Sequence, residues 1–289
     1  MQVVIAFFSP LNFASETCFL LCRKFHPAPD LIPWLAQGWE WCLSKDQSVP
    51  EIFPGTGAEI LFNLGEPITI TIHQQQALPR ACIVATGKTA LLCPRHARLS
   101  FTAQGKIHLL GLRLRSSACF DLFGVPLEHL CDLVLSLDEL GIATPNVELL
   151  IEQGPKALGF WLRQIVFRRR EQDQAMIRAI ERLYYGVSTA DLQLHLGVSM
   201  RTFQRRLYKH IGVDARYFLR TVRFQRTLRQ LLSGAPLLNT LLEQGYCDQS
   251  HFIKSRLFFT ERLPKKLLTP EHIALNHYSP LVNRLDGFL

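Results

Sequence analysis

Residues 188–211 read STADLQLHLGVSMRTFQRRLYKHI, and this stretch indicates the fold most clearly. It opens with the Ser-x-x-Asp spacing of a helix capping box, and Gly197 stands where the first apolar helix would end. Ser199 then offers a fresh N-cap, so we expect a second helix over Met200–Ile211. A helix, a short glycine-containing turn and another helix are typical of a helix-turn-helix motif, whose second helix enters a DNA groove.

The expected second helix has two chemically different faces at 100° per residue. Its apolar face consists of Phe203, Leu207 and Ile211. Its basic face consists of Arg201, Arg205 and Lys209, with Gln204 at the boundary. Arginine binds guanine and glutamine binds adenine through the major groove, while a lysine near the far end suits a phosphate. A merely solvated basic face would explain the charge but not the caps and turn in front of it.

A second, imperfect copy of this pattern follows about 48 residues later. We expect a short helix over Leu237–Gln244, a turn at Gly245-Tyr246 and another helix that opens at Cys247. Its open side and first turns carry Gln249, Ser250, Ile253 and Lys254. A helix over Tyr217–Leu232 would connect the two units, which could then grip adjacent major-groove faces of one duplex.

The net charge of the chain is concentrated in this same region. The formal net charge is +8, and residues 171–270 alone contain sixteen Lys and Arg against eight Asp and Glu. The rest of the 289 residues is balanced. This distribution is expected if one domain meets a polyanion and the other does not.

The N-terminal region has the composition of a β-domain. Short apolar segments separated by Gly and Pro indicate a small barrel or sandwich; examples are Glu59–Leu64, Ile68–Ile72, Ala81–Thr86 and Ile107–Leu114. The apolar start Met1–Phe8 lacks a basic n-region, so we interpret it as a core strand rather than a signal peptide. Between Val125 and Arg170 the pattern turns helical, with leucines at 127, 130, 133 and 137. Domains are therefore predicted over 1–170 and 171–270, followed by an apolar tail over 271–289.

Other function classes find little support in the sequence. The eight cysteines form no CxxC pair, and Cys18-x3-Cys22 lacks a second ligand pair, so we expect buried cytosolic thiols and no metal site. The histidines of the β region lack a His-x-His pair, and Trp34, Trp39 and Trp41 are expected in the core. No nucleophile-elbow, phosphate-loop or HExxH motif and no apolar membrane span is present. We expect a cytoplasmic protein that is not an enzyme and needs no cofactor.

With these motifs, residues 175–264 resemble the tandem helix-turn-helix domain of the AraC/XylS family of bacterial transcription regulators. The matching segments are LGVSMRTFQRRL from Leu196, VRFQR from Val222 and GYCDQSHFIK from Gly245, with Pro264 closing the domain. The N-terminal part also resembles that of a subset of these regulators, through FHPAP from Phe25, FPGTGAEILFNLGEP from Phe53, LGLRLR from Leu110 and LEHLCD from Leu127. The resemblance implies an α+β chain with a small cupin-like β-barrel, flanked by helices, ahead of an all-α DNA-binding domain.

The resemblance also implies functional residues and partners. The first recognition helix would contact DNA through Ser199, Arg201, Thr202, Gln204, Arg205 and Lys209. The second would use Gln249, Ser250, Ile253 and Lys254. The partners would be double-stranded DNA, a small-molecule effector in the barrel, RNA polymerase if the protein activates transcription, and a second copy of the chain.

Two departures from the family pattern affect the second recognition helix. The segment Arg256-Leu257-Phe258 places an arginine on the core face and two apolar residues away from it, and Glu261 replaces the usual glycine. A buried guanidinium without a partner costs several kcal/mol, so we expect Arg256 to reach solvent or to bind a carboxylate. The apolar tail over 271–289 could cover the exposed residues and restrain DNA contact, or could simply complete the core.

Three function classes remain open at this point. The first is a sequence-specific transcription regulator with an effector-binding or dimerisation barrel. The second is a barrel enzyme or small-molecule sensor whose helical domain has lost specific DNA reading, for which Arg256-Leu257-Phe258 is the only support. The third is a non-specific nucleic-acid or protein-interaction module. A salt titration of binding to cognate and random DNA separates these classes, because only a specific regulator keeps a large difference between its affinities for the two kinds of DNA.

Overall fold

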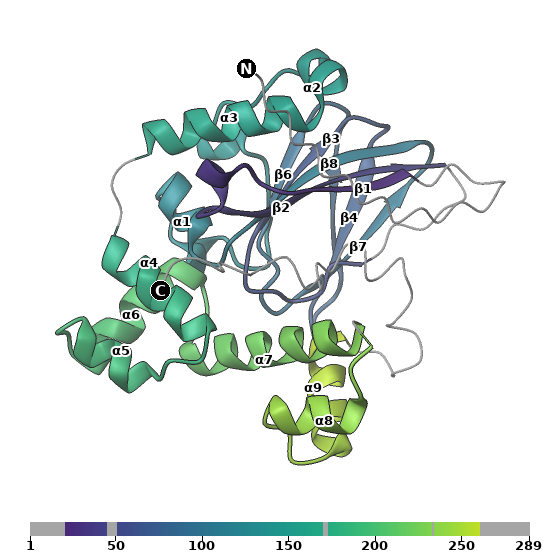
Figure 1. Cartoon of the computed structure of the whole chain (residues 1–289). Coiled ribbons are helices and arrows are strands. Elements are labelled where there is room, and N and C mark those ends of the chain that lie inside the picture. The colour runs from purple at the N-terminus through teal and green to yellow at the C-terminus, as the bar shows by residue number, and fades with distance from the viewer. Residues whose placement is uncertain (1–20, 45–50, 170–172, 233, 261–289) are drawn as a thin grey trace, which may run out of the picture.

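The computed structural model describes residues 21–44, 51–169, 173–232 and 234–260. Two antiparallel sheets build the N-terminal part, and helices build the described C-terminal part (Figure 1). The larger sheet has the strand order β1-β2-β8-β3-β6-β9 and the smaller one β5-β4-β7. The strands are β1 (Leu21–Phe25), β2 (Leu35–Leu43), β3 (Glu59–Asn63), β4 (Ile68–His73), β5 (Arg80–Val84), β6 (Thr89–Leu92), β7 (Arg98–Ala103), β8 (Ile107–Leu114) and β9 (Val134–Leu135).

Apolar side chains fill the space between the two sheets. Ile68, Ile70 and Ile72 of β4 are buried and alternate with half-buried residues, as expected for a strand with one face on the core. They share one apolar cluster with Trp39 and Trp41 of β2. The expected core role of these two tryptophans is confirmed.

Helices cover the other face of the six-stranded sheet. Above it lie α2 (Val147–Gln153) and α3 (Pro155–Arg168) (Figure 1). Trp161 of α3 meets Phe62 of β3 edge to face, with 5.5 Å between ring centroids. A further short helix, α1 (Ala118–Phe123), directly follows β8 and was not anticipated from the sequence.

From Val125 to Arg169, the described part of the segment expected to be helical, the chain is only partly α-helical, which corrects the sequence-based expectation. Its first half contains the 3-10 turns η2 (Leu127–His129) and η3 (Asp138–Leu140), with β9 between them. Asp132 has a left-handed φ of 57°, which ends any continuous helix there. A single carboxylate oxygen of Asp132 accepts three main-chain N–H groups, those of Arg95, His96 and Ala97. Three of the leucines that suggested a helix, Leu127, Leu130 and Leu137, are instead buried in the apolar cluster that also contains α2 and α3 residues.

The C-terminal part, as far as Thr260, consists of two helical units joined by one long helix. The elements are α4 (Gln174–Tyr184), α5 (Thr189–His195), α6 (Met200–Ile211), α7 (Ala215–Leu232), α8 (Leu237–Glu243) and α9 (Gln249–Thr260). Helices α4 to α6 lie at one end of α7, and α8 and α9 lie at the other (Figure 1). Each unit has its own apolar cluster. The expected α+β class, a β-domain followed by an all-α tandem helix-turn-helix domain, is confirmed.

Several sequence expectations lie outside the described residues. These are the strand at Met1–Phe8, the Cys18 thiol, Glu261 and the apolar tail over 271–289. The expected domain boundary at 170/171 also falls there, so it stays a prediction. In the part of the chain that the structure describes, no helix has the length and apolarity that a membrane crossing requires.

Candidate DNA-binding interface

The first helix-turn-helix unit is built by the local signals in its sequence. The side chain of Ser188 accepts the Asp191 N–H at 3.1 Å and caps α5. Gly197 then takes a φ of 63°, which suits a glycine and ends the helix. The Ser199 hydroxyl accepts the Thr202 N–H at 3.2 Å and starts α6, which spans the expected Met200–Ile211.

The two expected faces of α6 are present. Phe203, Leu207 and Ile211 are at most 1% exposed and pack in the core of the unit. The side chains of Arg201, Gln204 and Arg205 are exposed. Thr202 is half-buried, and its hydroxyl accepts from that of Ser199 at 3.0 Å. The structure therefore places the candidate base-contacting residues together on one solvent face.

An ion pair that was not anticipated from the sequence fixes α6 against the start of α4. Arg206 Nε donates to the Asp173 carboxylate at 2.7 Å. Burial acts to raise the pKa of Asp173, but the Arg206 bond and the Met176 N–H outweigh it, so the pKa is lowered. The same carboxylate caps α4 through that N–H. Arg206 is thereby committed to the unit's internal structure, whereas Arg201 and Arg205 face solvent.

The end of α6 is docked on the N-terminal part of the chain. The Lys209 ammonium lies 5.0 Å from the ring centroid of Phe120 in α1, a cation–π contact that would compete with its expected phosphate contact. His210 is 2% exposed, and its ring centroid lies 4.4 Å from that of Phe120. Burial lowers the pKa of His210 to about 4, although the Asp173 carboxylate acts in the opposite direction.

A buried arginine of the β-domain binds the last carbonyl of α6. Arg95 is 1% exposed, and its Nε donates to the Ile211 carbonyl at 2.9 Å. Its Nη1 donates to the carbonyls of Gly55 and Gly57 at 3.1 and 2.7 Å. In return, the Tyr217 hydroxyl at the start of α7 donates to the Arg95 carbonyl at 2.7 Å. The recognition helix and the connector are thus tied to the β-domain by charge-assisted and neutral hydrogen bonds.

Close backbone approach completes this contact. Gly212 follows α6 with a φ of 74°, and a Cβ placed there would lie 2.2 Å from the sulfur of Cys131. The Cys131 thiol donates to the Gly212 carbonyl at 3.3 Å. Only a glycine fits at this position, both for its backbone conformation and for its neighbours.

The second helix-turn-helix unit is less polar at its recognition helix. Asp248 accepts the His251 N–H at 2.7 Å, so α9 begins at Gln249 rather than at the expected Cys247. Helix α8 ends at Glu243, one residue before the expected end. Among the candidate residues on α9, the side chains of Gln249, Ser250 and Lys254 are exposed. The side chain of Ile253 is half-buried.

The side chain of Arg256 does not reach solvent, so the first of its two expected outcomes is wrong, while the expected carboxylate partner stays a prediction. It is 3% exposed and shares the buried face of α9 with Phe252 and Phe259, which keeps the guanidinium away from water. Burial lowers the pKa of Arg256 to about 10. One basic side chain of α9, that of Lys254, is exposed, compared with three on α6.

Phe258, one of the two apolar residues next to Arg256, is contacted by α7 and by the β-domain. The Arg220 guanidinium lies 3.6 Å from the ring centroid of Phe258, and the Tyr217 ring lies 5.9 Å from it. Gln75, in the β4–β5 connection, donates from Nε2 to the Phe258 carbonyl at 3.2 Å. Leu257 is 37% exposed in the described part of the chain. The β-domain therefore contacts both helix-turn-helix units.

Comparison with known proteins bears on both parts of the chain. A helix-turn-helix domain model matches residues 193–269, and a model described as a domain of unknown function (DUF6597) matches residues 23–136. The search of curated proteins gave no match.

Several solved structures are similar, at low identity. ToxT from Vibrio cholerae O395 is 11% identical with a TM-score of 0.46, over 80% of this chain and 96% of that one. ToxT from Vibrio cholerae strain SCE256 with bound unsaturated fatty acid is 12% identical with a TM-score of 0.45, over 88% and 96%. A cupin superfamily protein from Desulfitobacterium hafniense DCB-2 is 16% identical with a TM-score of 0.27, over 35% and 82%.

Proposed function

The two domain matches support an AraC family regulator, and from this premise we propose that the chain reads specific DNA sequences and regulates transcription. In this proposal α6 and α9 enter adjacent major grooves, under the control of the N-terminal domain. The observation that carries it is the solvent face of α6, where Arg201, Gln204 and Arg205 project from a helix whose opposite side is locked in the core.

Each exposed side chain of α6 suits a particular contact. Arg201 and Arg205 suit the O6 and N7 atoms of guanine, and Gln204 suits adenine. Ser199, Thr202 and Lys209 suit backbone phosphates, which position the helix without reading sequence. Lys209 would have to leave the Phe120 ring to reach a phosphate, which links DNA contact to the docking of α6.

Helix α9 is proposed to contribute less to binding than α6. Gln249, Ser250 and Lys254 suit base edges or phosphates, and Ile253 suits a thymine methyl group. Because Arg256 is buried, α9 presents less positive charge to DNA than α6 does, and its electrostatic attraction to the phosphates is weaker. The first unit would therefore supply most of the affinity.

The connector α7 supports reading by both units on one duplex. Its 18 residues correspond to a helix of about 27 Å at 1.5 Å per residue. Major-groove faces recur about every 34 Å along one side of B-DNA. A rigid helix of this length keeps two recognition helices apart by roughly that repeat.

Control by the N-terminal domain is proposed to act through its contacts with both units. Arg95 holds the end of α6, and Gln75 contacts α9, so a shift of the β-domain would alter the relation of the two recognition helices. A pocket of about 380 Å³ opens at this junction and is lined by Gln74, Gln75, His96, Tyr217 and Phe258. A small molecule bound there would touch both domains and could change their docking, which makes the pocket our preferred effector site over the barrel interior.

Further partners are part of the same proposal. The regulator would work in the cytoplasm on double-stranded DNA, would contact RNA polymerase if it activates transcription, and would pair with a second copy if its operator is repeated. The family and the fold point to a transcription regulator rather than to an enzyme.

The experiment that tests the proposal is a salt titration on selected and random DNA. Fragments enriched from a random library by the full-length protein provide the cognate site, and a shuffled fragment of equal length is the control. A specific regulator keeps a ratio of about 10³ or more between the two affinities across the titration. Equal affinities that fall in parallel with salt would leave only a non-specific basic module.

A further inference from the structure

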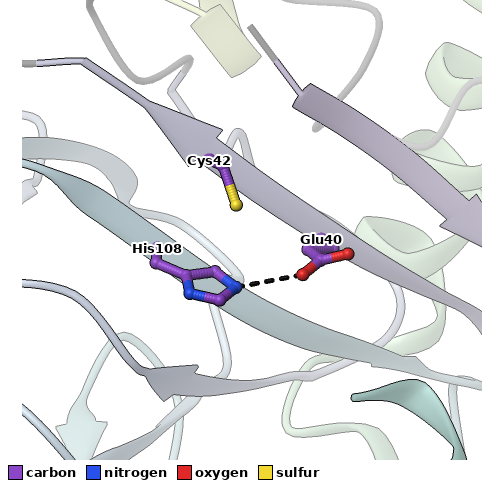
Figure 2. Close-up of side chains that lie close together, drawn as sticks. All are labelled: Glu40, Cys42 and His108. Carbon is purple, nitrogen blue, oxygen red and sulfur yellow. Dashed lines mark hydrogen bonds and ion pairs between the residues drawn. The ribbon is translucent and has the colours of Figure 1, made fainter. Parts of the chain in front are cut away.

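Three metal-ligating side chain types meet on the six-stranded sheet, outside the helix-turn-helix units. Figure 2 shows the carboxylate of Glu40 and the thiol of Cys42 projecting from β2 toward the imidazole of His108 on β8. One ligand atom from each residue lies within 4.8 Å of the other two. The Glu40 Oε1 and His108 Nε2 atoms are 3.0 Å apart.

The strand register explains why these side chains converge. Glu40 and Cys42 are two residues apart on β2 and so project from the same face of the sheet. His108 stands directly across from Cys42 in the antiparallel ladder. Directly opposed residues in such a pair have neighbouring side chains. The intervening Trp41 points to the other face, into the packed space between the sheets.

The surroundings make the cluster both ordered and accessible. Its residues face the same side of the sheet as Leu110 of β8, which is fully buried in the cluster under α2 and α3. The side chain of Glu40 is 13% exposed and that of His108 24%. Cys42 is half-buried and has a free thiol. Two paired strands thus hold the donors at the margin of the apolar cover, where the side chains of Glu40 and His108 keep some contact with solvent.

We propose that Glu40, Cys42 and His108 form a binding site for a divalent cation of borderline softness, with Zn²⁺ as its type. A thiolate, an imidazole and a carboxylate are the ligands that Zn²⁺ takes in proteins, whereas Mg²⁺ and Ca²⁺ take oxygen ligands. Ligand atoms around a tetrahedral Zn²⁺ lie about 3.3 to 3.7 Å from one another, given metal–ligand distances of about 2.0 to 2.3 Å. Shifts on the order of 1 Å at the side chain ends bring the three donors to that geometry.

Sequence patterns alone do not indicate this site. The two-residue spacing of Glu40 and Cys42 is the repeat of a β-strand and is not one of the usual zinc-binding spacings. His108 lies 66 residues after Cys42 in the chain. The expectation of no metal rested on the absence of CxxC and His-x-His pairs, which a site assembled across two strands does not need. Three protein ligands leave a fourth position for water or another donor.

Metal binding to the full-length, reduced protein tests the proposal directly. The protein is stripped with EDTA and titrated with Zn²⁺ by calorimetry, and with Co²⁺ by absorption spectroscopy. We expect one equivalent of Zn²⁺ to bind, and the Co²⁺ complex to show a thiolate-to-cobalt charge-transfer band with the intense visible bands of tetrahedral coordination. A wild-type protein that binds no stoichiometric Zn²⁺, or whose Co²⁺ complex lacks the thiolate band, overturns the proposal whatever the variants do.

Matched variants locate the ligands. Cys42→Ser and His108→Gln should each weaken Zn²⁺ binding by more than the roughly tenfold to hundredfold loss that is typical for an outer partner of a ligand. Cys82→Ser, which removes another half-buried thiol on β5 of the smaller sheet, should leave affinity and spectrum unchanged. Far-ultraviolet circular dichroism checks the fold of each variant. Loss of the thiolate band in Cys82→Ser with retention in Cys42→Ser would assign the metal elsewhere and contradict the proposal.

Discussion

The guanidinium of Arg95 in the β-domain donates a hydrogen bond to the carbonyl of Ile211, the last residue of the first recognition helix, at 2.9 Å. A helix end leaves its final carbonyls without partners inside the helix, and a cation placed there also interacts favourably with the helix dipole. The bond joins residues 116 positions apart in sequence. One buried side chain therefore links the position of α6, for which we propose the DNA-reading role, to the N-terminal domain.

Replacement of Arg95 should loosen the two domains from each other. Arg95→Met removes three bonds to main-chain carbonyls and leaves the carbonyls of Gly55, Gly57 and Ile211 with fewer donors. We expect the free energy of unfolding to fall by about 2 to 5 kcal/mol. Urea denaturation measures the change. Arg178→Ala, which removes an exposed arginine of α4, is the control and should change stability by less than about 0.5 kcal/mol.

Acid should destabilise the docked state through His210. Its folded pKa of about 4 lies below the unfolded value of about 6.5, so the unfolded chain binds more protons as the pH falls below 6.5. The stability held by neutral His210 is therefore present above pH 6.5 and is lost toward pH 4, by about 3 kcal/mol. The charged groups around the ring are Asp173, Arg206 and Lys209.

The His210→Leu variant isolates this effect, because it keeps an apolar side chain against Phe120 but cannot bind a proton. Denaturation midpoints measured between pH 7 and pH 4 should fall less steeply for the variant than for the wild type. Parallel slopes for the two proteins would show that another group carries the acid sensitivity.

The Asp173–Arg206 pair should contribute modestly to the stability of the first unit. Arg206→Ala breaks the pair but keeps the cap of α4, so we expect a loss of about 0.5 to 1 kcal/mol for this partly exposed pair. Asp173→Ala also removes the N-cap bond from the Met176 N–H, so its loss of stability should be larger by about 1 kcal/mol. Thermal unfolding of both variants gives the comparison. If Asp173→Ala were no worse than Arg206→Ala, the capping role assigned to Asp173 would be wrong.

The elements that the sequence predicted well are those with local causes. Helix α6 begins and ends where Ser199 and Gly212 direct it, and its faces follow from helical periodicity alone. The alternation in β4 likewise reports a strand with one face on the core.

The features that the sequence did not reveal depend on contacts between distant segments. Leucine spacing suggested a helix around Asp132. In the structure this residue lies in a non-helical segment, and its carboxylate accepts main-chain N–H groups of residues 95–97. The burial of Arg256, the docking of Arg95 and the approach of His108 to Cys42 likewise have no signature within a window of a few residues. Such contacts are fixed by the tertiary fold, so periodicity and capping signals cannot report them.

The most direct measurement of the central claim is the base preference of α6 variants on the DNA site selected by the wild-type protein. Arg201→Ala and Arg205→Ala should each cost about 1 to 3 kcal/mol on that site and should relax the preference for one guanine position each, as measured on single-base substitutions of the site. Arg178→Ala, with the same change of charge in the same unit, should keep the full base preference. If Arg201→Ala and Arg205→Ala weakened binding to every substituted site equally, α6 would be a non-specific phosphate contact and the reading role proposed for it would be contradicted.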